Sequence, residues 1–247
     1  MTGHLAEPRG PLRPRPALVL CHGFPLVGGA AAYAEATLPA LAERIAASSG
    51  WVVASFAFRG CGESSGDFSL GGWLDDVAAA VTHVAALPAV DGVWLAGFGT
   101  GGALAMCAAA SDTRVRGVAT LAAPADFDDW AAHPRRLLEF AREVGVIRSA
   151  RFPRDLDSWA VELRRVRPMA CVEALRDRAL IVVHGSEDDS VPVLDARVLA
   201  DGHGTADLRI ISGASHDLRL DPRAIAVLIG WLDRQWNRWQ VTQPAVR

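Results

Sequence analysis

The chain has 247 residues, of which 51% are hydrophobic, and its formal net charge is −3. This length and composition allow one α/β domain with a large core, and the charge favours neither nucleic acid nor an anionic membrane surface as a partner. No apolar run approaches the roughly 20 residues that a membrane span needs. All 25 basic residues are arginine, which excludes Schiff-base catalysis by a lysine.

The four cysteines are scattered along the chain, and none belongs to a C-x-x-C pair. We therefore expect neither a zinc site nor a disulfide framework. Residues 1–16 are rich in proline and arginine and lack the apolar stretch of a secretory signal. The sequence thus predicts a cytoplasmic protein with a flexible tail over 1–16 and a single domain over 17–247.

Short apolar runs alternate with helical patterns along this domain. The runs predict strands near residues 18–20, 51–58, 93–96, 115–121, 180–183 and 208–211. Apolar residues with helical spacing predict helices around 38–45, 73–84, 103–106 and 221–232, the last with Asp221-Pro222 as its start signal. This alternation predicts an α/β fold with a mostly parallel sheet and helices on both faces.

One connection is much longer than an ordinary α/β loop. It lies between the predicted strands at 115–121 and 180–183 and holds the aromatic residues Trp130, Phe140, Phe152 and Trp159. The excess length predicts a short helical insertion over about 124–170, called the cap below, whose aromatic side chains would line or roof a site. A plain surface excursion or an extension of the sheet edge is the alternative.

Residues 97–102 read Gly-Phe-Gly-Thr-Gly-Gly between a predicted strand and a predicted helix. A strand, a sharp glycine-rich turn and a helix are the setting of the nucleophile elbow, G-x-S-x-G. The position of the serine is occupied here by Gly99, which has no side chain that could attack a carbonyl group.

Four further segments match the motifs of one family in the expected order. They are His22-Gly23-Phe24, Arg59-Gly-Cys-Gly-Glu-Ser-Ser-Gly66, His184-Gly-Ser-Glu-Asp-Asp-Ser-Val-Pro192 and Gly213-Ala-Ser-His216. Together with the elbow, they make the chain resemble the α/β-hydrolase superfamily over nearly its whole length from residue 18.

The resemblance implies an α/β-hydrolase fold and assigns roles to five residues. His216 would be the general base, and Asp188 would orient it and stabilise its charged form. The backbone N–H groups of Phe24 and Thr100 would form the oxyanion hole. Gly99 would stand where the nucleophile belongs. No cofactor and no metal ion are implied.

Three functions remain open at this stage. A serine-less member of the family would bind a small acyl- or ester-like molecule without turnover. Alternatively, His216 and Asp188 would activate water or abstract a proton in a hydrolase or lyase. Less favoured is a nucleotide or anion binder, because residues 97–102 also spell G-x-G-x-x-G and Asp126 follows at a loosely suitable distance. A relocated nucleophile at Cys61 would need a lowered thiol pKa and a base within reach.

Overall fold

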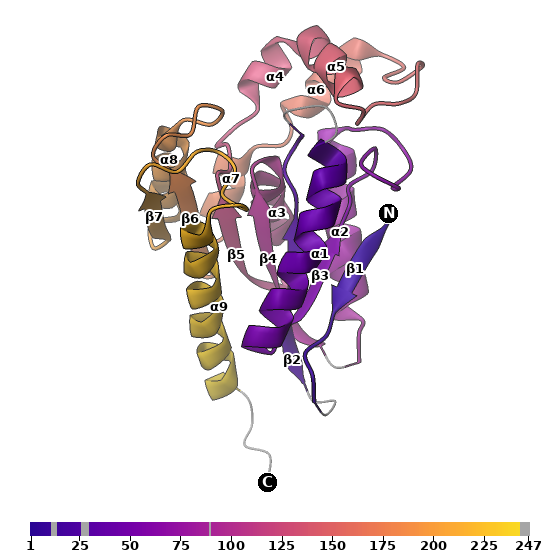
Figure 1. The fold of residues 1–247 in the computed structure, drawn as a ribbon. Coiled ribbons are helices and arrows are strands. Elements are labelled where there is room, and N and C mark those ends of the chain that lie inside the picture. Colours follow the sequence, from indigo (N-terminus) through magenta and orange to yellow (C-terminus); the bar gives the residue numbers. More distant parts are fainter. Residues whose placement is uncertain (11–13, 26–29, 89, 243–247) are drawn as a thin grey trace.

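The computed structural model describes residues 1–10, 14–25, 30–88 and 90–242. They form a central seven-stranded sheet with the strand order β1-β3-β2-β4-β5-β6-β7 (Figure 1). Five of the neighbouring pairs are parallel, and β1 runs antiparallel to β3. The strands are β1 Gly3–Ala6, β2 Arg15–Cys21, β3 Val52–Phe56, β4 Val90–Phe98, β5 Val115–Leu121, β6 Ala179–Gly185 and β7 Asp207–Ile211.

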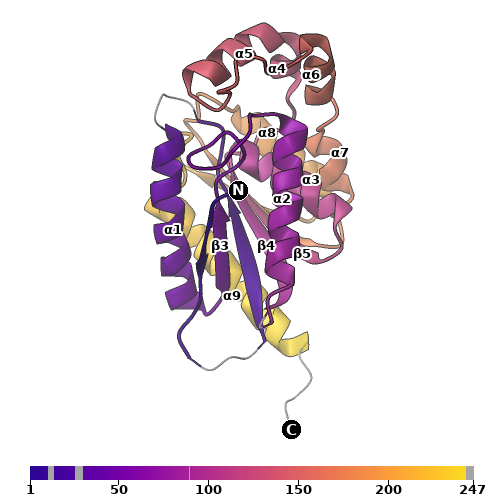
Figure 2. The ribbon, with the colours of Figure 1, turned by 90° about the vertical axis from the view of Figure 1, so that its right-hand side faces the viewer.

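Helices cover both faces of this sheet, as the alternating pattern predicts (Figures 1 and 2). Helices α1 and α9 pack on one face, and α2, α3 and α8 pack on the other. Along β2, Val19 faces the second layer while Leu18 and Leu20 face the first, so every position is buried. The bounds are α1 Ala30–Ser49, α2 Leu70–Ala85, α3 Thr100–Ser111, α8 Val193–His203 and α9 Pro222–Thr242.

The prediction of a flexible tail is wrong for Gly3–Ala6. This segment forms the edge strand β1, in which His4 pairs with Ser55 and Ala6 pairs with Val53. Only Ala6 in this four-residue strand is buried, so the segment shows no apolar alternation that a sequence pattern could reveal. Its order comes from backbone pairing with β3, which no local propensity encodes. Residues 11–13 lie outside the described part of the chain.

The cap forms four helices and contributes no strand to the sheet. Helices α4 to α6 lie beyond the end of the sheet at which β4 leads into α3 (Figures 1 and 2). Helix α7 packs beside α3. The bounds are α4 Asp128–Ala132, α5 Pro134–Glu143, α6 Leu156–Leu163 and α7 Pro168–Glu173.

Polar contacts hold the cap against the rest of the domain. Glu162 on α6 accepts a hydrogen bond of 2.6 Å from the backbone N–H of Gly71, in the first turn of α2. Asp67 accepts bonds of 2.7 and 2.9 Å from the N–H groups of Arg148 and Ser149. The cap is therefore fastened at two places outside the site.

The C-terminal helix α9 begins as its start signal predicts. The side chain of Asp221 accepts a bond of 2.8 Å from the N–H of Arg223, and Pro222 is the first helical residue. Trp239 is buried and donates to Asp91 at 3.2 Å, so it serves packing. No helix in the part of the chain that the structure describes is long and apolar enough to cross a membrane.

Candidate functional site

Gly99 occupies the turn between β4 and α3. Its backbone has φ 51° and ψ −127°, a conformation that is strained for any residue with a side chain. Its N–H donates to the carbonyl group of Leu121 at 2.8 Å. A Cβ atom built on Gly99 would lie 3.3 Å from Nε2 of His216. A side chain at this position would therefore contact the imidazole ring of His216.

The other glycines of the 97–102 segment are required by close packing. A Cβ atom on Gly101 would lie 2.2 Å from the carbonyl oxygen of His22, at the end of β2. A Cβ atom on Gly97 would lie 2.3 Å from the carbonyl oxygen of Gly101. Both distances are far inside van der Waals contact, so only glycine lets α3 start this close to the sheet.

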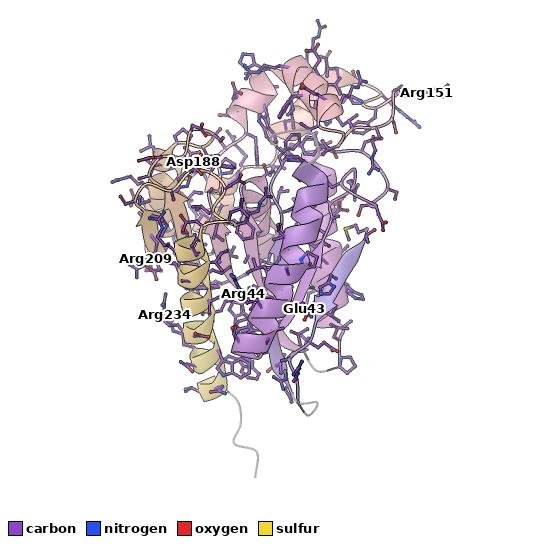
Figure 3. The ribbon with its side chains drawn as sticks, viewed as in Figure 1. Glu43, Arg44, Arg151, Asp188, Arg209 and Arg234 are labelled. Atoms are coloured by element: carbon purple, nitrogen blue, oxygen red, sulfur yellow. The ribbon has the colours of Figure 1, made fainter. Side chains whose placement is uncertain are left out.

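His216 and Asp188 come together from neighbouring loops. Asp188 follows β6 and His216 follows β7, and because these strands are parallel their loops emerge at the same end (Figure 3). Nδ1 of His216 lies 2.9 Å from Oδ2 and 3.1 Å from Oδ1 of Asp188. This contact places the Nδ1 proton toward the carboxylate and leaves Nε2 facing Gly99.

Asp188 is held ionised by its surroundings. Its side chain is fully buried, and Oδ1 accepts bonds of 2.9 and 2.8 Å from the N–H groups of Ser190 and Val191. Burial alone would raise the pKa of this carboxyl group. The hydrogen bonds from His184, His216 and the Val191 amide outweigh burial and hold the pKa well below its usual range. The site thus contains a fixed negative charge behind His216.

A second imidazole, that of His184, also contacts Asp188, although the motif that contains it implies no role for this residue. Nε2 of the buried His184 lies 2.9 Å from the carbonyl oxygen of Val191 and 3.3 Å from Oδ2 of Asp188. Both neighbours are acceptors, so Nε2 carries the proton. Burial alone would lower the pKa of His184, but these acceptors outweigh it and raise the pKa. His184 thus helps to fix the carboxylate.

The two residues whose amides are expected to form an oxyanion hole, Phe24 and Thr100, line the same cavity as His216. Thr100 is the first residue of α3, so its N–H has no acceptor in a preceding helical turn. Phe24 follows β2 and is positioned by His22. Nδ1 of His22 lies 2.8 Å from the carbonyl oxygen of Gly23, and its Nε2 accepts a hydrogen bond of 3.1 Å from the N–H of Phe58.

His22 makes the stability of the fold pH-dependent. Burial lowers the pKa of His22 from 6.5 to about 4, so the unfolded chain binds a proton that the folded chain rejects. Stability is therefore lost as the pH falls from 6.5 to 4, by about 3 kcal/mol from this group. We expect the free energy of unfolding, measured with urea, to fall between pH 7 and pH 4 in the wild type. In His22→Asn this fall should be smaller by that amount. The exposed His83→Asn serves as control, and an unchanged pH dependence in His22→Asn would refute this role.

The cavity beside His216 has a volume of about 340 Å³ and mixes aromatic, aliphatic and acidic side chains. Asp195, Asp129 and Phe127 line it, although no sequence motif points to them. Its lining residues are Phe24, Thr100, Pro124, Asp126, Phe127, Asp129, Trp130, Ser190, Val191, Pro192, Asp195 and His216.

Several residues that are site candidates from the sequence lie outside this cavity. Of the cap aromatics, Trp130 lines the cavity, whereas Phe140, Phe152 and Trp159 do not. Trp159 is instead buried, with its ring 6.3 Å from that of Phe68. Cys61 is fully buried and does not border the cavity. Among the residues described, no group of three His, Cys, Asp or Glu side chains could hold a metal ion.

Known structures share this fold. Est1E from Butyrivibrio proteoclasticus superposes with a TM-score of 0.71 at 18% identity, covering 98% of this chain and 94% of that one, and it has also been solved with ferulic acid bound. The α/β hydrolase GrgF from Penicillium sp. sh18 gives 0.70 at 20% identity, with 94% and 93% covered. Alpha/beta hydrolase domain-containing protein 10 from mouse gives 0.66 at 18% identity, with 96% and 94% covered.

At these identities the likeness shows the fold alone. The comparison with curated proteins finds no match. The sequence profile of the Alpha/beta hydrolase family, however, matches residues 18–228, which is most of the chain. This protein therefore belongs to the alpha/beta hydrolase family.

Proposed function

We propose that this protein binds a small acyl- or ester-like molecule and does not process it through a covalent acyl-enzyme. One observation carries the proposal: a Cβ atom on Gly99 would lie 3.3 Å from Nε2 of His216. A side chain at this turn would contact the base, but glycine supplies no atom that could attack a carbonyl group. Phe24 and Thr100 line the adjoining cavity, and their amides would receive the carbonyl oxygen of the ligand.

The second candidate function is catalysis by the histidine itself. The contact of 2.9 Å between His216 and Asp188 is the arrangement that a general base needs, and Nε2 of His216 is left unused by it. A water molecule or an acidic C–H group beside Gly99 could give its proton to this nitrogen. In that case the protein is a hydrolase or lyase without a covalent intermediate.

The remaining alternatives have less support. The three glycines of the G-x-G-x-x-G spacing need no nucleotide to explain them. A Cβ atom on Gly97 or Gly102 would lie 2.3 or 2.8 Å from a backbone carbonyl oxygen, and Gly99 has a positive φ of 51°. A nucleophilic role for Cys61 would require its thiol to reach His216, yet it is buried outside the cavity. None of the four cysteines forms a disulfide bond, which agrees with the cytoplasmic location that we propose.

The proposal is tested on the unmodified protein. Intact-mass spectrometry after treatment with a fluorophosphonate is expected to show no covalent adduct, and a panel of activated esters is expected to show no turnover above the buffer rate. A hydrolase of the same fold with an intact serine serves as the positive control. Turnover without an adduct, abolished by His216→Ala, would instead establish the second candidate. An adduct on Cys61 would overturn both.

A further inference from the structure

The cavity beside His216 carries a chemical preference of its own. We propose that its ligand bears a protonated amine, held between the carboxylates of Asp126 and Asp195 and the aromatic rings around Trp130. This inference rests on the proposed function, because it specifies the ligand of the same cavity. It goes beyond it by naming the charge that the ligand must carry.

Aromatic rings form one wall of the cavity. The ring of Trp130 lies 5.1 Å from that of Phe24 at 63° and 5.2 Å from that of Phe127 at 37°. All three residues line the cavity, so their π-faces and edges surround a common space. The face of an aromatic ring is negative and attracts an ammonium group within about 6 Å, most strongly when the ring is the indole of tryptophan.

Carboxylates line the same cavity. Asp129 is engaged by Arg136 at 2.6 Å, so its charge is compensated. Asp195 is fixed by the N–H of Ala125, which donates to Oδ2 at 2.9 Å. Asp126 accepts a bond of 2.9 Å through Oδ1 from the N–H of Asp128. One oxygen of Asp126 and one of Asp195 have no hydrogen bond among the described residues and are available to a ligand.

The charge balance of the cavity is one-sided. The chain has 25 arginines, yet none is among the described residues that line this space, where His216 is the sole group able to become positive. A cavity with carboxylates and no cation raises the local concentration of positively charged ligands and repels anions. The ligand we infer is therefore an amine that also carries the carbonyl group facing the amides of Phe24 and Thr100.

The test compares two probes of equal size that differ in charge, phenethylammonium and phenethyl alcohol. Titration calorimetry on the wild-type protein at low salt is expected to give a Kd about tenfold lower for the ammonium ion. In the double variant Asp126→Asn/Asp195→Asn, the Kd of the ammonium ion is expected to rise about tenfold while that of the alcohol stays within about twofold.

A charge-matched control removes two other carboxylates from the cap. Asp128 and Glu139 are exposed and do not line the cavity, so Asp128→Asn/Glu139→Gln is expected to change both affinities less than about twofold. Circular dichroism and melting temperatures establish that each variant is folded. Equal affinities for the two probes or no binding of either would overturn the proposal. So would a loss of affinity for the ammonium ion in the control variant as large as that in Asp126→Asn/Asp195→Asn. None of these results bears on whether the protein lacks turnover, which the fluorophosphonate and ester assays decide.

Discussion

Replacing Gly99 by serine is expected to create an esterase, raising the hydrolysis of small activated esters roughly 100-fold or more above the wild-type rate. The physical reason is the position of the new side chain. Its Cβ atom would lie 3.3 Å from Nε2 of His216, a contact that requires the imidazole to move by a few tenths of an ångström. The hydroxyl group would then be within hydrogen-bond reach of a base that Asp188 already orients.

The matched control is Gly99→Ala. Both substitutions place a Cβ atom at a residue with φ 51°, so both should lose stability, on the order of 1–3 kcal/mol. Only the serine variant should hydrolyse esters and gain the mass of a fluorophosphonate adduct. A serine variant that is folded, as shown by circular dichroism, but no more active than the alanine variant would mean that the cavity no longer positions an ester for attack.

The fold could be predicted from the sequence because the central strands of the sheet are buried on both faces. The continuous apolar runs of β2, β4, β5 and β6 have no other stable location than the middle of a parallel sheet. The edge strand β1 was missed for the opposite reason. It has a single buried residue, Ala6, and it is ordered by pairing with β3, far away in the chain.

The same distinction applies to the site. Gly99, Asp188 and His216 stand in loops with motif spacing, and parallel strands bring the loops of β6 and β7 together, so their meeting was predictable. The cavity wall was not. Asp195 is positioned by the N–H of Ala125, a contact across 70 residues that leaves no local pattern, and only one of the four cap aromatics noted in the sequence, Trp130, lines the cavity.

Removing the charge of Asp188 is expected to abolish most of the activity that Gly99→Ser creates. In the double variant Gly99→Ser/Asp188→Asn, kcat for an activated ester should fall roughly 10³- to 10⁴-fold from that of Gly99→Ser. The reason is the tautomer of His216. Oδ1 of residue 188 accepts from the amides of Ser190 and Val191, so an asparagine would keep its carbonyl oxygen there. Its NH₂ group would then face Nδ1 of His216 and drive the proton to Nε2, where the ring can no longer accept one from serine.

The neighbouring carboxylate provides the control. Asp189 is exposed and its carboxylate accepts only from the hydroxyl group of Ser190 among the described residues, so Gly99→Ser/Asp189→Asn should keep kcat within about threefold. The Asp188→Asn change also turns an NH₂ group toward Nε2 of His184, which itself donates, and this should lower the melting temperature. Activity is therefore compared well below the melting temperatures of both double variants. If Asp188→Asn leaves kcat unchanged there, His216 is not oriented by this carboxylate during the reaction, and the pair cannot be the base system of the site.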